Sequence, residues 1–398
     1  METKTTGRAG AGLIVLFCFF IAFLEGYDIQ SFGVAAPKLI PEFGLNPGQQ
    51  GWAGSAAMLG LVIGAFAGGW IADRIGRKPV LVASVAAFGL FSLATAMTHG
   101  FPELLAVRVG AGLGFGGVMP NLMALASEIS APNRRAGTVT AMFCGMPAGG
   151  AAVSLLARLG GAELDWRTIF LVGGGLPLLL TPLAFFLLPE TKPQEAPHSD
   201  HRWTTTLFAE GRTAGTLLLW TIFFGTAVVL YLMLNWLPTL VTAKGFTPGD
   251  GSTAAIGFNV MAVVGALVMG YAIDRVGFRW PTMAIFVTLM TAMAGLAIVT
   301  QLTPILLLSA LAGFGVVGGQ FAFYGVAPML YPAHVRAAGA GAAVAVGRMG
   351  SIVGPLLAGE LRQAGYSAGQ VFGALIPVVL TAGVAAFALS FLGKLRDD

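Results

Sequence analysis

The sequence predicts an all-α integral membrane protein with twelve transmembrane helices in two halves of six. Composition is the first observation behind this prediction: of 398 residues, 56% are apolar and only 10% are charged, which leaves too little polar surface for a soluble protein. The second is that the apolar residues form blocks of about 20 residues or more, the length that crosses a bilayer core as a helix. The third is an internal repeat with an offset of 201 residues.

Twelve apolar blocks follow one another along the chain. They are residues 12–37, 51–72, 79–98, 102–127, 136–158, 168–188, 213–242, 252–273, 280–300, 303–330, 337–360 and 368–393. The first block is too long and too acidic for the core of a signal peptide, so we expect it to remain as a membrane helix. The two cysteines, Cys18 and Cys144, fall inside predicted spans and give no disulfide framework.

The basic residues between the spans predict the orientation. With a cytoplasmic N-terminus, fifteen Lys and Arg residues lie on the cytoplasmic side and five on the other, which is the positive-inside distribution. We therefore expect a multi-pass protein of the bacterial inner membrane with both termini cytoplasmic. The formal charge of +4 fits contact with membrane lipid, and no basic cluster indicates a nucleic acid partner. We expect a monomer.

The repeat relates the two halves of the chain. Residues 69–77, GWIADRIGR, reappear as residues 270–278, GYAIDRVGF, and residues 111–114 match residues 312–315 at the same offset of 201. Matches in register along the chain indicate two homologous halves. The expected division is a half at 1–190, a polar cytoplasmic linker at 191–212 and a second half at 213–398.

Two carboxylates lie inside the first span. Glu25 and Asp28 are three positions apart and so share one face of a helix. A carboxylate at the bilayer centre costs at least about 2.5 kcal/mol, so such residues face a polar cavity or partners inside a bundle. We expect these two carboxylates to form a site that takes up a proton.

Several motifs resemble a known family of carriers. Residues 69–78, GWIADRIGRK, resemble the loop signature of the major facilitator superfamily, and residues 108–114, RVGAGLG, resemble its pattern in span four. Residues 25–28, EGYD, are similar to the D-G-x-D motif of its aromatic acid:proton symporter family, with Glu in the first acidic position. With residues 119–128 and 347–355, the chain looks most similar to 3-(3-hydroxyphenyl)propionate transporters. The resemblance implies the major facilitator fold.

Two arginines are the basic residues that fall within spans, Arg108 and Arg348. A guanidinium suits a carboxylate better than other side chains do, so we expect both to bind the substrate, with Asp28 near Arg108; the alternative is that each only braces the fold. Polar and aromatic residues at depth are expected to complete the substrate site, although such residues also serve in packing. They are Asn121, Tyr231, Asn235, Gln320 and Tyr324.

A conformational latch is expected at the cytoplasmic edge. The resemblance implies that Asp73 and Arg77 pair with Glu128 in one conformation and release it in the other; the alternative is that these charges only anchor the loop. In the second half, Asp274 and Arg336 repeat the feature. Phe278 stands at the position equivalent to Arg77, so we expect the second latch to be weaker.

These observations together predict a carrier that takes up an aromatic monocarboxylate, of hydroxyphenylpropionate or hydroxybenzoate type, with one or more protons. An exporter working by proton antiport is the alternative on the same fold, and a receptor that binds without transport is a third possibility. We expect no enzyme activity, because all four histidines fall in loops and no nucleophile has a base at depth. The proton is the coupling ion, and no cofactor or metal is expected.

Overall fold

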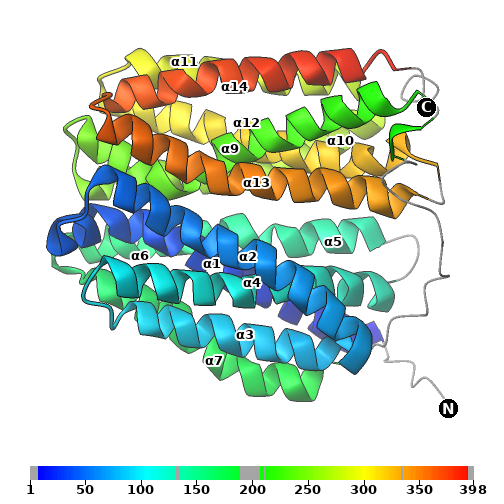
Figure 1. Ribbon diagram of the computed structural model, residues 1–398, viewed down its shortest axis with the longest axis horizontal. Helices are drawn as coiled ribbons and strands as arrows, with labels where there is room; N and C mark the ends of the chain where they lie inside the picture. Colours follow the sequence, from blue (N-terminus) through cyan, green and yellow to red (C-terminus); the bar gives the residue numbers. More distant parts are fainter. Residues whose placement is uncertain (1–7, 131–134, 189–206, 210, 333–334, 393–398) are drawn as a thin grey trace. The chain divides into compact units, whose positions relative to one another are not determined.

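The computed structural model describes residues 8–130, 135–188, 207–209, 211–332 and 335–392, and these are almost entirely helical (Figure 1). The longer helices are α1 (Arg8–Phe43), α2 (Pro47–Ile75), α3 (Arg77–Thr95), α4 (Phe101–Ile129), α5 (Arg135–Phe143), α6 (Gly145–Gly160), α7 (Trp166–Leu187), α9 (Thr213–Ala243), α10 (Pro248–Val276), α11 (Arg279–Ile298), α12 (Leu302–Val326), α13 (Arg336–Gln363) and α14 (Ala368–Leu389). Short 3-10 turns follow α6 at Gly161–Glu163 and α12 at Ala327–Leu330.

Twelve segments of the described chain are long and apolar enough to cross a membrane. The prediction of an all-α protein with twelve spans is therefore confirmed. The 201-residue offset also reproduces the helix boundaries: shifting α2 by 201 gives the bounds of α10, and α4 and α12 begin 201 residues apart. The repeat in the amino-acid sequence is therefore also a repeat of helices in the structure.

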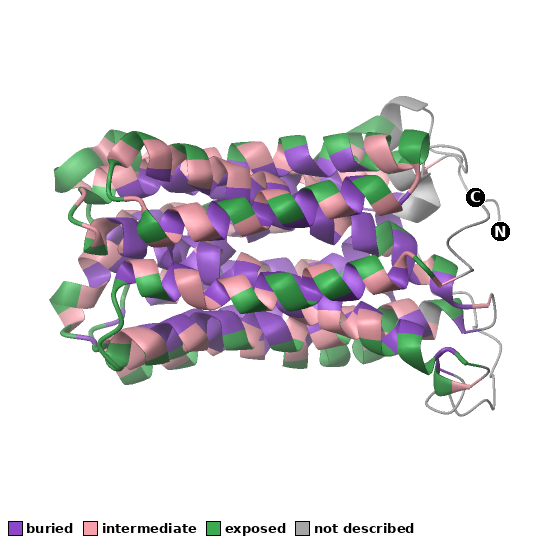
Figure 2. Ribbon diagram, turned by 90° about the horizontal axis from the view of Figure 1, so that it is seen from above, coloured by how far each residue is buried: buried purple, intermediate pink, exposed green. Residues whose placement is uncertain are grey.

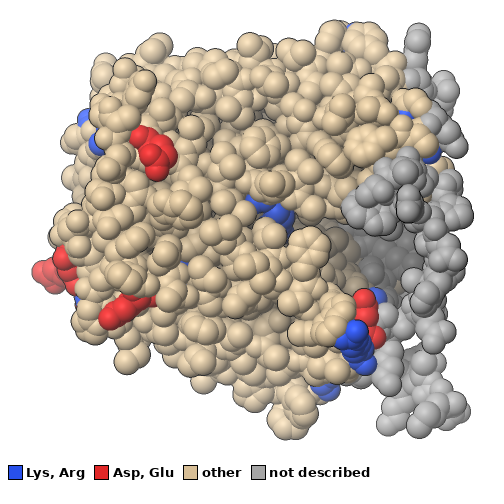
Figure 3. Space-filling view, viewed as in Figure 1, with Lys and Arg blue, Asp and Glu red and all other residues tan. Residues whose placement is uncertain are grey.

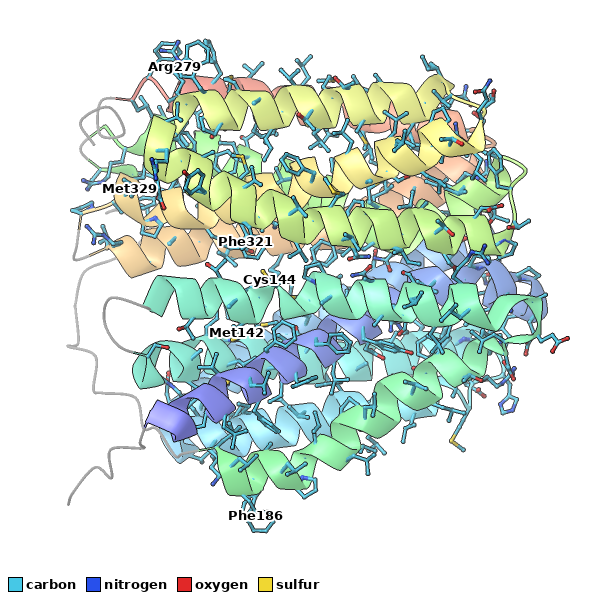
Figure 4. All side chains as sticks on the ribbon, turned by 180° about the vertical axis from the view of Figure 1, so that it is seen from behind. Met142, Cys144, Phe186, Arg279, Phe321 and Met329 are labelled. Atoms are coloured by element: carbon cyan, nitrogen blue, oxygen red, sulfur yellow. The ribbon has the colours of Figure 1, made fainter. Side chains whose placement is uncertain are left out.

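The fifth predicted span, residues 136–158, is not one continuous helix. It consists of α5 and α6, which meet at Cys144 (labelled in Figure 4). Pro147 has no N–H to donate to the carbonyl of Phe143, and its ring disfavours a regular helix over the preceding turn. The proline therefore explains the interruption three residues before it.

The contacts of the chain divide it into two compact units. The first contains residues 1–39 and 56–196, and the second contains residues 40–55 and 197–398. In the first unit α3 packs against α4 and α7, and in the second unit the equivalent α11 packs against α12 and α14 (Figure 1). The start of α2 groups with the second unit, where Ser55 Oγ donates to Ile352 O at 2.7 Å. Most of the expected linker, residues 191–206 and 210, lies outside the described residues.

Glycines bring the helices of each unit into close contact. A Cβ on Gly112 of α4 would lie 2.0 Å from Ala57 O of α2, and a Cβ on Gly313 of α12 would lie 2.0 Å from Phe258 O of α10. These glycines are 201 residues apart. Small residues at helix contacts let backbones approach in a membrane, so the glycine richness has a packing role.

Large apolar side chains remain exposed on the outer helix faces. Phe66, Phe186 and Ile298 are 72%, 80% and 80% exposed, and Figure 2 shows exposed residues along the helices throughout the fold. On the face seen in Figure 3, most of the described charged side chains lie toward the helix ends. An apolar surface between charged ends is what a lipid bilayer requires.

Candidate functional site

The first unit contains a buried acid–base cluster from three helices. Asp28 on α1 and Arg108 on α4 are 0% and 1% exposed, with Arg108 Nη1 lying 3.8 Å from Asp28 Oδ2. Ser92 on α3 donates a hydrogen bond from its hydroxyl to Asp28 Oδ1. The structure therefore brings the predicted pair of Asp28 and Arg108 together and adds Ser92 to it.

The ion pair leaves hydrogen-bonding capacity unused. Among the described residues, Arg108 Nε, Nη1 and Nη2 and Asp28 Oδ2 have no hydrogen-bond partner, although the guanidinium lies 5.5 Å from the Phe32 ring centroid. Buried charged groups usually satisfy their hydrogen bonds, and a buried pair without them gains little net stability. The arrangement suits a function in which the charge of the pair changes.

The other three residues of the EGYD motif, Glu25, Gly26 and Tyr27, are packed against neighbouring helices or buried. A Cβ on Gly26 would lie 2.1 Å from Met146 O, so this glycine allows α6 to pack against α1. Tyr27 donates from its hydroxyl to Ile169 O of α7 at 3.2 Å, and Glu25 is 1% exposed. The motif fixes α1 among its neighbours and keeps both carboxylates buried.

The second unit contains a polar hollow with aromatic walls. Arg348 Nη1 on α13 donates to the Tyr231 hydroxyl on α9 at 2.9 Å. The rings of Phe223 and Tyr324 meet edge to face, with centroids 5.4 Å apart. The hollow is small, with a volume of about 10 Å³, and is lined by Phe223, Ala227, Tyr231, Gln320, Tyr324, Val344, Gly347 and Arg348.

The structure thus gathers four of the predicted substrate residues, Arg348, Tyr231, Gln320 and Tyr324, around one hollow. Asn235 is not among the residues that line it. That residue is buried on α9, where Nδ2 donates to Tyr231 O at 2.9 Å and Oδ1 has no partner among the described residues.

Asn121 and Arg108, the other two predicted substrate residues, belong to the first unit. Asn121 is buried, and its Nδ2 donates to Gly117 O of the same helix at 2.8 Å. That bond is an ordinary way to satisfy a polar side chain inside a membrane helix.

The expected latch residues lie at helix ends. Asp73 is exposed at the end of α2, Arg77 begins α3, and Gly76 between them has φ 99°. Gly277, its equivalent in the second half, has φ 79°, so both turns use the left-handed region that glycine adopts readily. Asp274 and Arg336 are exposed, and the side chain of Glu128 lies outside the described part of the chain. The latch stays a prediction.

Sequence reasoning did not single out Ser92 and Phe223. Both lie in apolar helices, Ser92 on α3 and Phe223 on α9, where a lone serine or phenylalanine gives no signal by itself. The described residues hold no group of three or more His, Cys, Asp or Glu side chains placed to bind a metal.

Comparison with known proteins places this geometry in a family. The model of the Major Facilitator Superfamily matches residues 18–261. A 3-(3-hydroxy-phenyl)propionate transporter of Escherichia coli K12 is 39% identical over 98% of this chain and 97% of its own length. A 4-hydroxybenzoate transporter of Pseudomonas aeruginosa is 34% identical over 91% of this chain and 89% of its own. A gallate transporter of Pseudomonas putida is 34% identical over 90% of this chain and 87% of its own length.

Solved structures show the same fold. A bacterial homologue of the lysosomal transporter Spinster, in an inward-facing and occupied conformation, has a TM-score of 0.78 at 16% identity, over 98% of this chain and 99% of its own. A D-xylose–proton symporter has a TM-score of 0.74 at 15% identity, over 93% of this chain and 96% of its own length. The family model and the curated relatives, together with the twelve apolar helices, indicate a multi-pass bacterial membrane protein and a transporter rather than an enzyme. The chain belongs to the major facilitator superfamily and is similar along nearly its whole length to aromatic acid transporters within it.

Proposed function

We propose that this protein takes up an aromatic monocarboxylate, of hydroxyphenylpropionate or hydroxybenzoate type, together with a proton across the bacterial inner membrane. The observation that supports it most is the hollow of the second unit, where Arg348 and Tyr231 stand beside the Phe223 and Tyr324 rings. The three relatives are named for acids that combine one carboxylate with a hydroxylated ring. A guanidinium and aromatic walls are the groups that such a molecule requires.

Arg348 is the proposed partner of the substrate carboxylate. Tyr231 accepts a hydrogen bond from Nη1, which orients the planar guanidinium beside the hollow. The Phe223 and Tyr324 rings provide flat apolar walls for the substrate ring, and Gln320 adds an amide for a ring hydroxyl. Each group in the hollow thus has a part of the substrate to recognise.

Asp28 is the proposed proton carrier, with Glu25 beside it. Asp28 is fully buried next to Arg108, and an ionisable group in such a place within a membrane helix is by default a functional residue. Protonation of Asp28 would release Arg108 from its ion pair and reduce the negative charge that opposes an entering anion. Proton and substrate would therefore favour each other's binding.

The internal repeat supports this division of roles. The positions 201 residues before Arg348 and Tyr231 hold Pro147 and Gln30, and the position 201 residues after Asp28 holds Val229. Each unit thus has proposed functional side chains that are absent from the equivalent positions of the other unit. We assign proton coupling to the first unit and substrate recognition to the second, and we place both termini in the cytoplasm.

Counterflow in proteoliposomes tests the proposed substrate class. Vesicles preloaded with unlabelled 3-(3-hydroxyphenyl)propionate should transiently accumulate the labelled acid, and 4-hydroxybenzoate should compete. The amide of the same acid, which has no carboxylate, should compete poorly. Binding without counterflow would identify a receptor, and equal competition by the amide or by a neutral sugar would contradict the proposal.

We further propose that Asp73 and Arg77 form the cytoplasmic latch with Glu128. Asp73→Asn should slow turnover and raise labelling of a reporter cysteine at Ser130, at the end of α4, by roughly two- to fivefold, as expected for an exposed ion pair. The matched control is Asp274→Asn, which should change labelling less because Phe278 stands where Arg77 stands in the first half. Unchanged labelling together with lost expression would show that Asp73 serves folding and topology instead.

A further inference from the structure

We propose that Ser92 is a positioning residue for proton coupling: its hydroxyl holds one oxygen of Asp28 and directs the other oxygen toward Arg108. The inference rests on the proposed role of Asp28 as proton carrier and extends it to a residue on a different helix. Ser92 does not contact the substrate in this account. It acts through Asp28 by fixing which oxygen is available to the proton.

The geometry separates the two oxygens of the Asp28 carboxylate. Oδ1 accepts the hydrogen bond from Ser92 Oγ, whereas Oδ2 lies 3.8 Å from Arg108 Nη1 and accepts no hydrogen bond from the described residues. Ser92 is 1% exposed, so its hydroxyl has no bulk water to bind in place of the carboxylate. Oδ2 is therefore the oxygen with an open site for a proton.

The repeat shows that the fold does not need this cluster. The positions 201 residues after Asp28, Ser92 and Arg108 hold Val229, Met293 and Ser309. All three are 0% exposed, and Ser309 donates only to Ile305 O of its own helix at 2.7 Å. The second unit thus builds the same region with apolar packing and a local hydrogen bond. A serine placed against a carboxylate is specific to the first unit.

The elements around Asp28 offer few other charges. From α4 the facing charge is Arg108, and from α1 the titratable neighbours are Tyr27 and Glu25. Helix α7 presents Gly173, where a Cβ would lie 3.3 Å from Asp28 Oδ1, and α3 presents the Ser92 hydroxyl. Among the described residues, Ser92 is therefore the neutral hydrogen-bond donor through which the chain adjusts Asp28.

The hydrogen bond has a definite effect on proton binding. A hydroxyl that donates to a carboxylate stabilises the ionised form more than the protonated form. Without that donor, Asp28 would keep its proton up to a higher pH. Because uptake needs Asp28 protonated on the outside, the fall of uptake at high external pH should then move to higher pH, by about one to two pH units for a charge-assisted hydrogen bond.

The test compares three serine variants in proteoliposomes. Ser92→Ala should move the alkaline limb of pH-gradient-driven uptake upward by about one to two units, and Ser92→Thr, which keeps the hydroxyl, should restore the wild-type limb. The matched control is Ser31→Ala, because Ser31 is equally buried in the same unit but donates to Tyr27 O at 2.9 Å. In that control, the external pH at which uptake falls should be the same as in the wild type. If Ser92→Thr does not fold, Ser92→Cys, which keeps a weaker donor, should give an intermediate shift.

The outcomes distinguish this inference from the proposed function. An unshifted limb in Ser92→Ala, with gradient-driven accumulation still lost in Asp28→Asn, would show that Ser92 only packs and would overturn the inference alone. An equal shift in Ser31→Ala would also overturn it, because the effect would then be general loosening of the unit. Full accumulation in Asp28→Asn would instead remove the proposed role of Asp28 itself.

Discussion

Asp28→Asn is expected to abolish the accumulation of aromatic acid driven by a pH gradient while leaving exchange of substrate across the membrane. The amide is neutral at every pH and so imitates the protonated carboxylate, which in this account is the loaded form. Asp28 is 0% exposed beside Arg108, so water would not replace its function. Uptake against a gradient and counterflow without one, measured in the same proteoliposomes, separate the two activities.

Glu25→Gln is the matched control for that variant. Glu25 is also buried and lies one turn away on α1, whereas Asp28 is the carboxylate that pairs with Arg108 and accepts the hydrogen bond from Ser92. We therefore expect a milder loss of accumulation. An equal loss in both variants would indicate a carboxylate pair that shares its proton and titrates jointly. Full accumulation by Asp28→Asn would contradict its role as carrier.

Arg348→Lys is expected to weaken binding of the aromatic acid by roughly 10- to 150-fold, the range of one charge-assisted hydrogen bond. Lysine keeps the positive charge but lacks the planar pair of donors that matches a carboxylate. It also loses the fixed orientation that Tyr231 gives to the guanidinium through Nη1. Arg348→Ala should lose more, because the charge itself is gone. Direct binding of labelled acid to purified protein measures both.

The amide of the same acid decides what Arg348 recognises. Wild-type protein should prefer the acid strongly, and Arg348→Ala should discriminate far less between acid and amide. If that variant keeps the wild-type preference, then Arg348 is a structural brace, and Arg108 becomes the candidate for the carboxylate. Tyr231→Phe is a useful companion, because it removes the acceptor of the 2.9 Å bond while leaving the guanidinium in place.

The fold was largely predictable because its signals extend over many residues. Twelve apolar blocks and a 201-residue offset are each visible along the whole chain, and the bounds of α2 and α10 follow the offset residue for residue. The pairing of Asp28 with Arg108 was also predictable, since charges buried in a membrane seek each other. The break at Cys144 was missed because a proline in a span more often bends a helix than interrupts it.

Which other residues face a site depends on how each helix is rotated about its own axis, and apolar sequences specify this rotation weakly. A helix that is hydrophobic on all sides gives no moment to show which face meets a neighbour, so nothing indicated that Ser92 would face Asp28 or that Phe223 would face Tyr324. Asn235, predicted to contact the substrate, donates from Nδ2 to Tyr231 O of its own helix and does not line the hollow, so its substrate role stays a prediction. An asparagine one turn after Tyr231 can donate to its own helix while its Oδ1 has no partner among the described residues, and sequence does not distinguish that arrangement from a ligand contact.

The most direct test of proton-coupled uptake is the response of transport to the direction of a pH gradient. Proteoliposomes holding the purified protein would receive labelled 3-(3-hydroxyphenyl)propionate under an acidic exterior, then under an inverted gradient, and then with a protonophore. Protein-free vesicles would correct for passive entry of the neutral acid. We expect concentrative uptake with the acidic exterior, net efflux when the gradient is inverted, and equilibration alone with the protonophore. Efflux driven by the acidic exterior, or uptake indifferent to the gradient, would contradict symport.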